Sequence, residues 1–533
     1  MNYNRFGILI DCSANGVMKV EQVKHLIDLM KTMGYNLLEL GMDDVYKIDG
    51  EPYFGYLRGG YTQAELKELD DYAFERGIEL VPCVQTLAHL TNLVKLPHYA
   101  DIVDVDNILL IDEPKTYELI EKMFQTIRKC FRTNCANIGM DEAHMVGLGK
   151  YLDKHGHQNR FDLLLKHLGK VVDIAEKYGF KVHMWSDMFF RLNNHGDYYV
   201  KGSNVPQEVL DKVPDNVDIC YWDYGEHELT EEMFDELFRQ HEAFGKDIWF
   251  AGGAWCWNGF APFNRYSLAA MKCALKQAAN HSVRNVFITL WGVDSNDCSY
   301  FSTLPTLYAL RQYADGIYDE ETIKKGFYDT FGLSFDDFML ADLPNVTSRD
   351  PLGLLRENPC KALLYNDCFL GWKDYPLERV DKIPYGDYAK RLETVANKMG
   401  EFKYIFDNLA ALCRVLEFKA YLGIRTRKAY QAKDKKELRR LLEDYAVAAD
   451  RVEEFRKTMR KMWMKEYKPY GWEVQQIRLG GLRSRILDCR LRIVEYLEGQ
   501  ADSIPELEEE ILPYADWGLQ YNLYRGLVSV SEL

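Results

Sequence analysis

The chain has 533 residues, and its content of 47% hydrophobic and 28% charged residues excludes an intrinsically disordered protein. Its 66 Lys and Arg residues against 82 Asp and Glu residues give a net charge of −16, which predicts no nucleic-acid partner because such a surface repels phosphate. No run reaches the ~18 apolar residues that a membrane span requires, so we expect no membrane partner either.

The amino terminus and the cysteines bear on the cellular compartment. The first residues contain no basic segment, and Asp11 interrupts the first apolar stretch, so no signal peptide is predicted. The 12 cysteines are spread through apolar segments without the Cys-x-x-Cys spacing of a zinc site or a redox pair. These features predict a cytoplasmic protein whose cysteines are reduced and packed in the core.

Residues 1–315 alternate short apolar runs with longer segments of helical period, which is the pattern of a parallel sheet. We expect eight strands, over 6–11, 36–41, 79–84, 136–140, 181–185, 217–222, 248–251 and 285–291. The helices expected between them cover 20–33, 63–76, 115–130, 161–178, 231–244 and 266–280. No Gly-rich phosphate motif follows a strand, which disfavours an open nucleotide-binding sheet. The predicted fold is α/β, a (β/α)8 TIM barrel with its active site at the carboxyl ends of the strands.

The pattern becomes helical after residue 350. No proline occurs between Gly386 and Lys468, and apolar residues recur there at steps of three and four. We expect three long helices, over about 387–430, 434–466 and 473–498. Residues 316–533 are therefore predicted to form a C-terminal all-α helical domain, an antiparallel bundle that packs on the barrel.

Two adjacent carboxylates, Asp141 and Glu142, follow the fourth predicted strand. Adjacent strand residues point to opposite sides, so both can serve one pocket only where the strand turns into its loop. Taken alone, the pair fits a helix N-cap with a first-turn acid equally well.

Tryptophan occurs at or just beyond the ends of four consecutive predicted strands, as Trp185, Trp222, Trp255 and Trp291. Barrel interiors favour Val, Ile and Leu. A rim of indoles interleaved with Asp, Glu and Tyr suits a ring-shaped polyol instead, because apolar sugar faces stack on aromatic rings while the hydroxyls bind carboxylates.

Over residues 1–315 the sequence resembles glycoside hydrolase family 20, the β-N-acetylhexosaminidases, and within it a compact intracellular branch of bacterial type. The resemblance rests on the Asp141-Glu142 pair, on His89 after strand three, on Trp185 closing strand five, and on Trp291 with an acid shortly after it. It implies exo-hydrolysis of terminal, non-reducing β-linked N-acetylglucosamine or N-acetylgalactosamine from an oligosaccharide or glycoside. The implied reaction needs no metal and no organic cofactor, because the substrate's own acetamide oxygen attacks and forms an oxazolinium ion.

The resemblance assigns two catalytic residues and several substrate-binding ones. Glu142 matches the general acid/base, and Asp141 matches the carboxylate that orients the acetamido group. Trp185, Trp255 and Trp291 would wall the subsite of the terminal sugar. The family's tyrosine, which donates to the acetamide oxygen, is assigned to Tyr224, with Tyr221 as the competing candidate.

Three further residues carry less specific assignments. His89 either positions Asp141 or a sugar hydroxyl, or is a rim histidine with structural hydrogen bonds. Asp187 either binds substrate or caps the next helix. Asp294 would bind the O4 and O6 hydroxyls, although it lies three residues after Trp291, where the family usually has its acid two residues after.

The sequence departs from the family pattern after strand one. The family has a motif ending Asp-x-x-Arg there, whereas Asp11 is followed by Cys12, Ser13 and Ala14. Arg5 precedes the strand and is expected at the opposite mouth of the barrel. The missing arginine predicts tolerance of both the gluco and the galacto configuration.

Two rival interpretations remain open at this point. A metal-dependent sugar isomerase would use Glu142, His89, Asp187 and Asp223 as cation ligands. A catalytically silent sugar-binding barrel would use the helical domain as its interaction surface. The sequence contains no signal for an oligomeric state.

Overall fold

Eight parallel strands close into a barrel in the order β1-β2-β3-β6-β7-β8-β9-β10, with β10 paired to β1. The computed structural model describes residues 3–225, 227–513, 519, 523–529 and 531. The strands are β1 (Arg5–Asp11), β2 (Leu37–Gly41), β3 (Glu79–Cys83), β6 (Cys135–Asn137), β7 (Lys181–Trp185), β8 (Val217–Trp222), β9 (Ile248–Gly253) and β10 (Asn285–Leu290). The predicted (β/α)8 barrel is confirmed, with each strand near its expected place.

The fourth predicted strand is shorter than expected, because the chain leaves the sheet after Asn137 rather than at Met140. Gly139 and Met140 have φ angles of 68° and 70°, which lie in the left-handed region and end the extended backbone. This early turn puts the two carboxylates that follow it on the loop rather than on the strand.

Period-two alternation along the strands separates two packing regions. In β1, Ile8 and Ile10 face the surrounding helices, whereas Leu9 faces the barrel interior with Trp185 and Phe287. The interior also holds polar groups, since His183 Nε2 lies 2.9 Å from Glu39 Oε1. The barrel is filled by side chains up to its carboxyl mouth, so ligands are confined to that mouth.

Helices cover the outside of the barrel in chain order. The principal ones are α1 (Val20–Met33), α2 (Gln63–Glu75), α4 (Pro114–Cys130), α6 (Arg160–Lys177), α9 (Glu231–Glu242), α10 (Asn264–Asn280) and α11 (Leu304–Ala314). Local signals explain their ends: Thr62 and Glu65 form a capping box at the start of α2, and Gly34 ends α1 with φ 87°. A small antiparallel pair, β4 (Val103–Val105) and β5 (Ile108–Leu109), which was not predicted, lies between β3 and α4.

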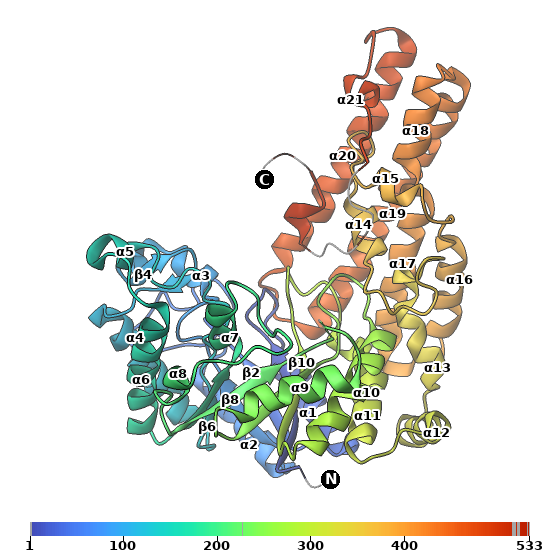
Figure 1. Cartoon of the computed structure of the whole chain (residues 1–533). Helices are drawn as coiled ribbons and strands as arrows, with labels where there is room; N and C mark the ends of the chain where they lie inside the picture. Colours follow the sequence, from blue (N-terminus) through green and yellow to red (C-terminus); the bar gives the residue numbers. More distant parts are fainter. Residues whose placement is uncertain (1–2, 226, 514–518, 520–522, 530, 532–533) are drawn as a thin grey trace.

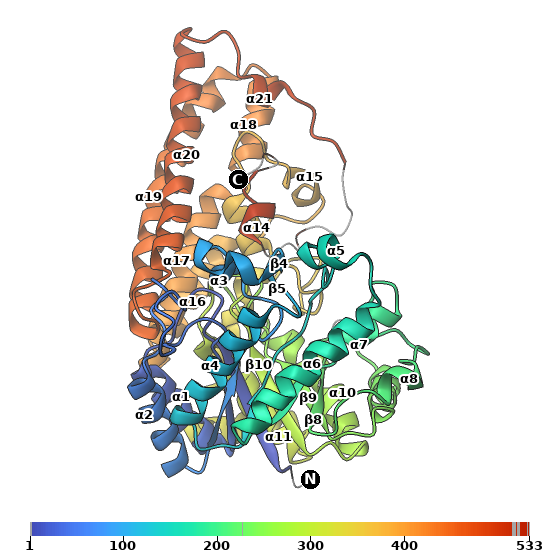
Figure 2. The same cartoon turned by 90° about the vertical axis from the view of Figure 1, so that its left-hand side faces the viewer.

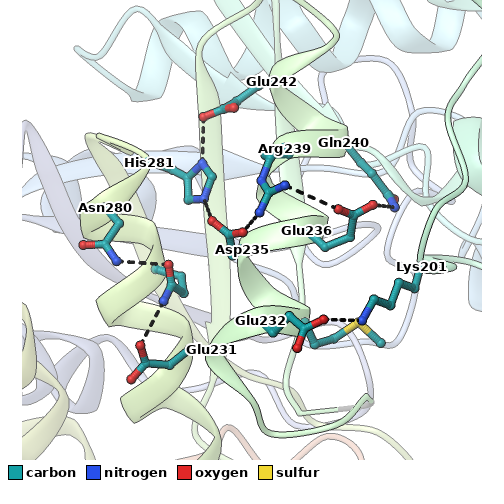
Figure 3. A network of polar contacts seen from close by, with 12 residues as sticks. Lys201, Glu231, Glu232, Asp235, Glu236, Arg239, Gln240, Glu242, Asn280 and His281 are labelled. Atoms are coloured by element: carbon teal, nitrogen blue, oxygen red, sulfur yellow. Dashed lines mark hydrogen bonds and ion pairs between the residues drawn. The ribbon is translucent and has the colours of Figure 1, made fainter.

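An ionic contact joins α9 and α10 on the barrel's outer face. Figure 3 shows His281, just after α10, between Asp235 and Glu242 of α9, with ring nitrogen distances of 2.9 and 2.8 Å. Arg239 also pairs with Asp235. The histidine is therefore structural and lies on the helical layer.

The C-terminal part is helical, as predicted, but the prediction of its first long helix as a single element is wrong. The expected helix over 387–430 is divided into α16 (Tyr385–Ala396), α17 (Lys403–Lys419) and α18 (Leu422–Gln431). Gly400 adopts φ 51° at the first break, a conformation that ends an α-helix. The other two, α19 (Lys435–Glu466) and α20 (Trp472–Glu498), match their predictions within one residue.

The helical part docks against loops at the carboxyl mouth of the barrel. Figures 1 and 2 show α19 and α20 rising side by side beyond the barrel, on the side away from the N-terminus. Met18 forms a bridge with Tyr467, and Asn15 Nδ2 donates to the Gly471 carbonyl at 2.9 Å. The domain boundary at residue 315 stays a prediction, and it falls in the short turn after α11. No helix among the described residues is long and apolar enough to cross a membrane.

Candidate active site

A cavity of about 480 Å³ lies at the carboxyl mouth and receives residues from the ends of all eight barrel strands. Its polar side is formed by residues after β1, β2, β3 and β6, namely Asp11, Ser13, Asp43, Gln85, His89, Asp141 and Glu142. Its aromatic side is formed by residues after β7, β8, β9 and β10, namely Trp185, Trp222, Tyr224, Trp257 and Trp291. The cavity thus combines the two features that the sequence predicted for a sugar site.

Asp141 is held in place by the residues that follow β3. Gln85 Nε2 donates to Asp141 Oδ1 at 2.7 Å, and His89 Nε2 lies 3.1 Å from Asp141 Oδ2. Burial opposes ionisation of Asp141, but the charge of His89 and these contacts outweigh it and hold the pKa of the carboxyl below its usual value. Burial alone would lower the pKa of His89, yet Asp141 and Glu142 raise it to about 10. The pair is therefore a carboxylate and an imidazolium at neutral pH.

Gly139 is required by this arrangement. A Cβ at residue 139 would lie 2.1 Å from Gln85 Oε1, and the φ of 68° already disfavours any other residue. The same oxygen accepts a hydrogen bond from the Met140 amide at 3.2 Å. A glycine before the carboxylate pair therefore lets one glutamine hold both the loop and Asp141.

Glu142 lies at the cavity rim with a partly exposed side chain. Its Oε1 accepts a hydrogen bond from the Tyr198 hydroxyl at 2.8 Å, and its Oε2 lies 3.5 Å from His89 Nε2. Its backbone has φ 50°, a conformation that non-glycine residues adopt mainly where the surroundings enforce it. Tyr198 was not predicted from the sequence, because it lies in an irregular segment far from any strand end.

Asp187 does not line the cavity. It is completely buried at the start of α7 (Asp187–Asn193), and its Oδ2 accepts a hydrogen bond from the Glu142 amide at 2.9 Å. Burial raises the pKa of Asp187 well above its usual value, and the charge of Asp141 adds to this. The structure places this residue behind Glu142 as a support, not in contact with the space that a substrate would occupy.

Two of the three predicted tryptophans line the cavity, and the third lies behind its wall. The rings of Trp185 and Trp291 are 5.9 Å apart between centroids. Trp255 stacks on Trp257 at 4.2 Å, and it is Trp257 that faces the cavity. Sequence alternation cannot choose between residues 255 and 257, because both lie on the same side of an extended chain.

Tyr224 rather than Tyr221 faces the cavity. Tyr221 is completely buried and donates to Asp223 Oδ2 at 2.9 Å. Tyr224 lines the cavity and stacks on Trp222, with 5.3 Å between the ring centroids. The Nε1 of Trp185 is buried without a hydrogen-bond partner among the described residues, which leaves an indole donor at this wall.

Asp294 is not brought into the site. Its carboxylate is bound by Lys361 at 2.7 Å and by Arg478 at 3.0 Å, and it accepts from the Tyr524 amide at 2.7 Å. Val293 lines the cavity in its place. The one-residue offset from the family pattern therefore corresponds to a change of role, because Asp294 connects the barrel to the helical part.

Among the residues that the structure describes, no arginine after β1 or β2 lines the cavity in place of the one that the family pattern has after β1. Arg5 pairs with Glu79 at 2.7 Å at the amino mouth, as predicted. Asp11 Oδ1 accepts from the Ser13 amide at 2.7 Å and its Oδ2 from the Gly292 amide at 3.0 Å, so this carboxylate shapes the loop. Asp43, which the sequence analysis missed, lines the cavity; burial, with the charge of Asp11, raises its pKa to about 8. Its signal is similar to that of Asp141, an acid shortly beyond the end of a strand.

The isomerase interpretation finds no support. It needs at least three His, Cys, Asp or Glu side chains placed to hold one cation, and the part of the chain that the structure describes has no such group. His89 is held as a cation by Asp141, and Asp187 is buried behind the loop.

Comparisons with known proteins place the chain in a family. Residues 3–236 match "Glycosyl hydrolase family 20, catalytic domain", and residues 336–520 match "Glycoside Hydrolase 20C C-terminal domain". Hexosaminidase D of Bos taurus is 25% identical over 221 residues, which are 39% of this chain and 59% of that protein. A probable beta-hexosaminidase of Arthroderma benhamiae is 22% identical over 288 residues, which are 47% of this chain and 44% of that protein.

A solved structure, the GH20 exo beta-N-acetylglucosaminidase of Vibrio harveyi in complex with N-acetylglucosamine, is 19% identical. The match covers 63% of this chain and 58% of that one, with a TM-score of 0.48. This chain thus spans between 44% and 59% of these two curated relatives. From the two family matches, which together cover more than half of the chain, we conclude that the chain belongs to glycoside hydrolase family 20.

Proposed function

We propose that the protein is an exo-acting β-N-acetylhexosaminidase that removes terminal, non-reducing N-acetylglucosamine or N-acetylgalactosamine with retention of configuration. The observation that carries the proposal is the shared cavity of Asp141 and Glu142, in which one carboxylate is held ionised by His89 and the other points to the open rim. Family membership and the hexosaminidase names of the relatives support the same activity.

In the proposed mechanism Glu142 is the general acid and then the general base. It protonates the glycosidic oxygen as the bond to the anomeric carbon breaks, and it later takes a proton from the attacking water. Tyr198 fixes Oε1 at 2.8 Å, which leaves the other oxygen for the leaving group. General acid help of this kind contributes roughly 10²- to 10⁴-fold.

Asp141 directs the internal nucleophile. Its depressed pKa keeps it ionised, so it can accept the acetamide N–H while the acetamide oxygen attacks the anomeric carbon. The carboxylate then faces the positive charge of the oxazolinium ion, whose formation needs no covalent bond to the protein. His89 and Gln85 hold this carboxylate in one orientation, which preserves the proximity advantage of an intramolecular attack.

The aromatic side is suited to the acetamide group. Trp185 and Trp291 would enclose its methyl group, and the Tyr224 hydroxyl would donate to its oxygen. Trp257 takes the part that the sequence assigned to Trp255.

Asp43 is the residue we assign to the sugar hydroxyls in place of the missing arginine. It lies on the polar side of the cavity, within range of the charge of His89, and a carboxyl whose pKa is about 8 is mainly protonated at pH 7. A protonated carboxyl both donates and accepts, whereas an arginine only donates. This property suits hydroxyls of either the gluco or the galacto configuration.

The proposal is tested with 4-nitrophenyl β-N-acetylglucosaminide and β-N-acetylgalactosaminide. We expect turnover of both by the wild type, and a loss of at least about 10²-fold in Glu142→Gln on glycosides with poor leaving groups. Glu118→Gln, on the exposed face of α4, is the control and should keep full activity. Strong inhibition by a thiazoline analogue of the oxazoline is also expected. Absence of turnover would favour a silent sugar-binding barrel, and indifference to the thiazoline would reject substrate assistance.

We also propose that the protein acts in the cytoplasm. All 12 cysteines lie within the described residues and are free thiols, 11 of them buried, which suits a reducing compartment. Fractionation of the source cells, with the chain detected by antibody, tests this; recovery from the medium or a membrane fraction would contradict it.

A further inference from the structure

A second cavity, of about 660 Å³, lies beside the active site between the loop after β6, the start of α6 and the end of α7. Its charged and titratable lining residues are His144, His157, Arg160, Arg191 and His195, and no carboxylate lines it. Such a cavity is unusual for a chain with a net charge of −16. None of these residues was predicted from the sequence, because they come from the loop after β6, the segment around the start of α6, and the end of α7 with the turn that follows it.

We propose that this cavity binds an acidic group, a carboxylate or sulfate, on the sugar from which the terminal N-acetylhexosamine is cleaved. This inference rests on the proposed function, since it places the acidic group on the leaving-group side of Glu142. It adds a substrate class, acidic oligosaccharides, to the proposed activity.

The two arginines are held in place without being neutralised. Arg160 Nε donates to the Val146 carbonyl at 3.2 Å, and its Nη2 donates to the His144 carbonyl. Arg191 Nη1 donates to the Gly196 carbonyl. Within the described residues neither guanidinium has a carboxylate partner, so no ion pair compensates either charge and donor positions remain toward the cavity.

The lining residues repel one another, and a bound anion would relieve this repulsion. Burial lowers the pKa of Arg160, and the charge of Arg191 lowers it further. Burial and the charge of Arg191 also lower the pKa of His144. Arginine forks match planar carboxylates and sulfates with paired hydrogen bonds, which is how proteins commonly bind such groups.

One hydroxyl connects this cavity to the general acid. The Tyr198 hydroxyl lies 2.6 Å from His144 Nε2 and donates to Glu142 Oε1 at 2.8 Å. Because its single proton is used toward Glu142, the hydroxyl must accept from His144, whose proton is therefore on Nε2. The glycosidic oxygen must reach Glu142 for its protonation, so the sugar beyond that oxygen begins next to this cavity.

The experiment compares disaccharides that differ in one group. N-Acetylglucosamine is β-linked to glucose, to glucuronate or to glucose 6-sulfate, in both the 1→3 and 1→4 linkages, and kcat/KM is measured for each. We expect the wild type to prefer the acidic members by roughly tenfold to a hundredfold, the range that charge-assisted hydrogen bonds supply. The preference should vanish in the Arg160→Gln/Arg191→Gln double variant, whose kcat/KM should be the same for the acidic and the neutral members.

Two controls keep the result decisive. Arg128→Gln removes a half-buried arginine at the opposite mouth that also donates to a carbonyl, that of Phe131, and it should keep the preference. Arg191→Gln alone, which removes the contacts with the Gly196 carbonyl and the Tyr198 ring, is measured in parallel because Arg160 also holds the loop after β6. It should lose most of the preference.

Equal specificity constants for neutral and acidic disaccharides in the wild type would overturn the proposal. Stabilisation of the wild type, and not of the double variant, by inorganic sulfate without any substrate preference would also overturn it, since the cavity would then serve free anions. If none of the disaccharides is cleaved, the proposed function fails separately. In that case, calorimetry measures the affinity of the intact chain for the glucuronate and the glucose disaccharides. Tighter binding of the glucuronate disaccharide would support the cavity as a site for acidic groups, and equal affinities would overturn it.

Discussion

The backbone amide of Glu142 donates a 2.9 Å hydrogen bond to Asp187 Oδ2. A carboxyl that follows β7 thus fixes the main chain of the loop that follows the neighbouring strand, β6. Glu142 has a φ of 50°, and a residue in that region needs its surroundings to hold it. The bond is buried on the Asp187 side, where no water can replace it. Asp187 therefore acts on the reaction through the position of Glu142.

Replacement of Asp187 should separate positioning from charge. Asp187→Asn retains an oxygen that accepts from the Glu142 amide, so we expect kcat within about threefold of the wild type. Asp187→Ala leaves that amide without a partner and should lower kcat by roughly tenfold to a hundredfold, with little change in KM. Steady-state kinetics on the 4-nitrophenyl glycoside measures both. An equal loss in the two variants would contradict this role and point to the charge itself.

The pair of His89 and Asp141 predicts a pH dependence of stability. The pKa of His89 is raised to about 10, so its contribution is complete below its ordinary value near 6.5 and is lost as the pH rises through 10. The pKa of Asp141 is lowered, so the same interaction is also lost as the pH falls below the ordinary aspartate range. The denaturation midpoint of the wild type should therefore decrease as the pH is raised from 7 to 10. His89→Gln should flatten this fall, and an unchanged slope would count against the ion pair.

Asp43 should affect substrate binding without choosing between the epimers. Asp43→Ala is expected to raise KM about tenfold for both the N-acetylglucosaminide and the N-acetylgalactosaminide. Asp43→Asn imitates the protonated carboxyl and should remain close to the wild type below pH 8. The wild-type kcat/KM should change as Asp43 ionises near pH 8, and Asp43→Asn should lack this change. A variant that loses only one epimer would refute the dual donor and acceptor role.

Asp294 should matter for stability rather than for sugar binding. Its carboxylate is nearly buried and pairs with both Lys361 and Arg478, so Asp294→Ala leaves Arg478 without its anion and leaves Lys361 with Asp297 alone. Breaking such a pair costs about 3–5 kcal/mol of unfolding free energy. Chemical denaturation should show this loss, while KM for the 4-nitrophenyl glycoside stays unchanged at a temperature where the variant is folded. A raised KM with unaltered stability would restore the role inferred from the family.

The barrel could be predicted because its signals are local. Apolar runs of strand length, helical periods and glycines at helix ends recur along the first 315 residues, and each gives its element without knowledge of the others. The prediction of one helix over 387–430 was wrong for the opposite reason. Apolar residues recur there at steps of three and four across both breaks, which are set by Gly400 and by tertiary packing.

The site was predictable where a residue closes a strand. Asp141, Glu142, His89, Trp185, Tyr224 and Trp291 all line the cavity for that reason. Tyr198 comes from an irregular segment, whose path the sequence pattern does not give, and Arg191 comes from the short helix α7, which was not predicted. The choice between Trp255 and Trp257 depends on a loop conformation, and the true position of Asp294 depends on partners that lie 67 and 184 residues away.

Trp185 belongs at once to the packed interior of the barrel and to the wall of the cavity, with Trp222 and Trp291 resting on the same cluster. One side chain thus both fills the barrel interior and lines the cavity, so a change in the shape of the cavity at Trp185 also changes the packing of the core. An engineer who wishes to admit a bulkier acyl group would lose thermal resilience by shrinking Trp185. Trp257 stacks on Trp255 outside that interior, so a smaller residue at position 257 should enlarge the cavity with a smaller loss of stability.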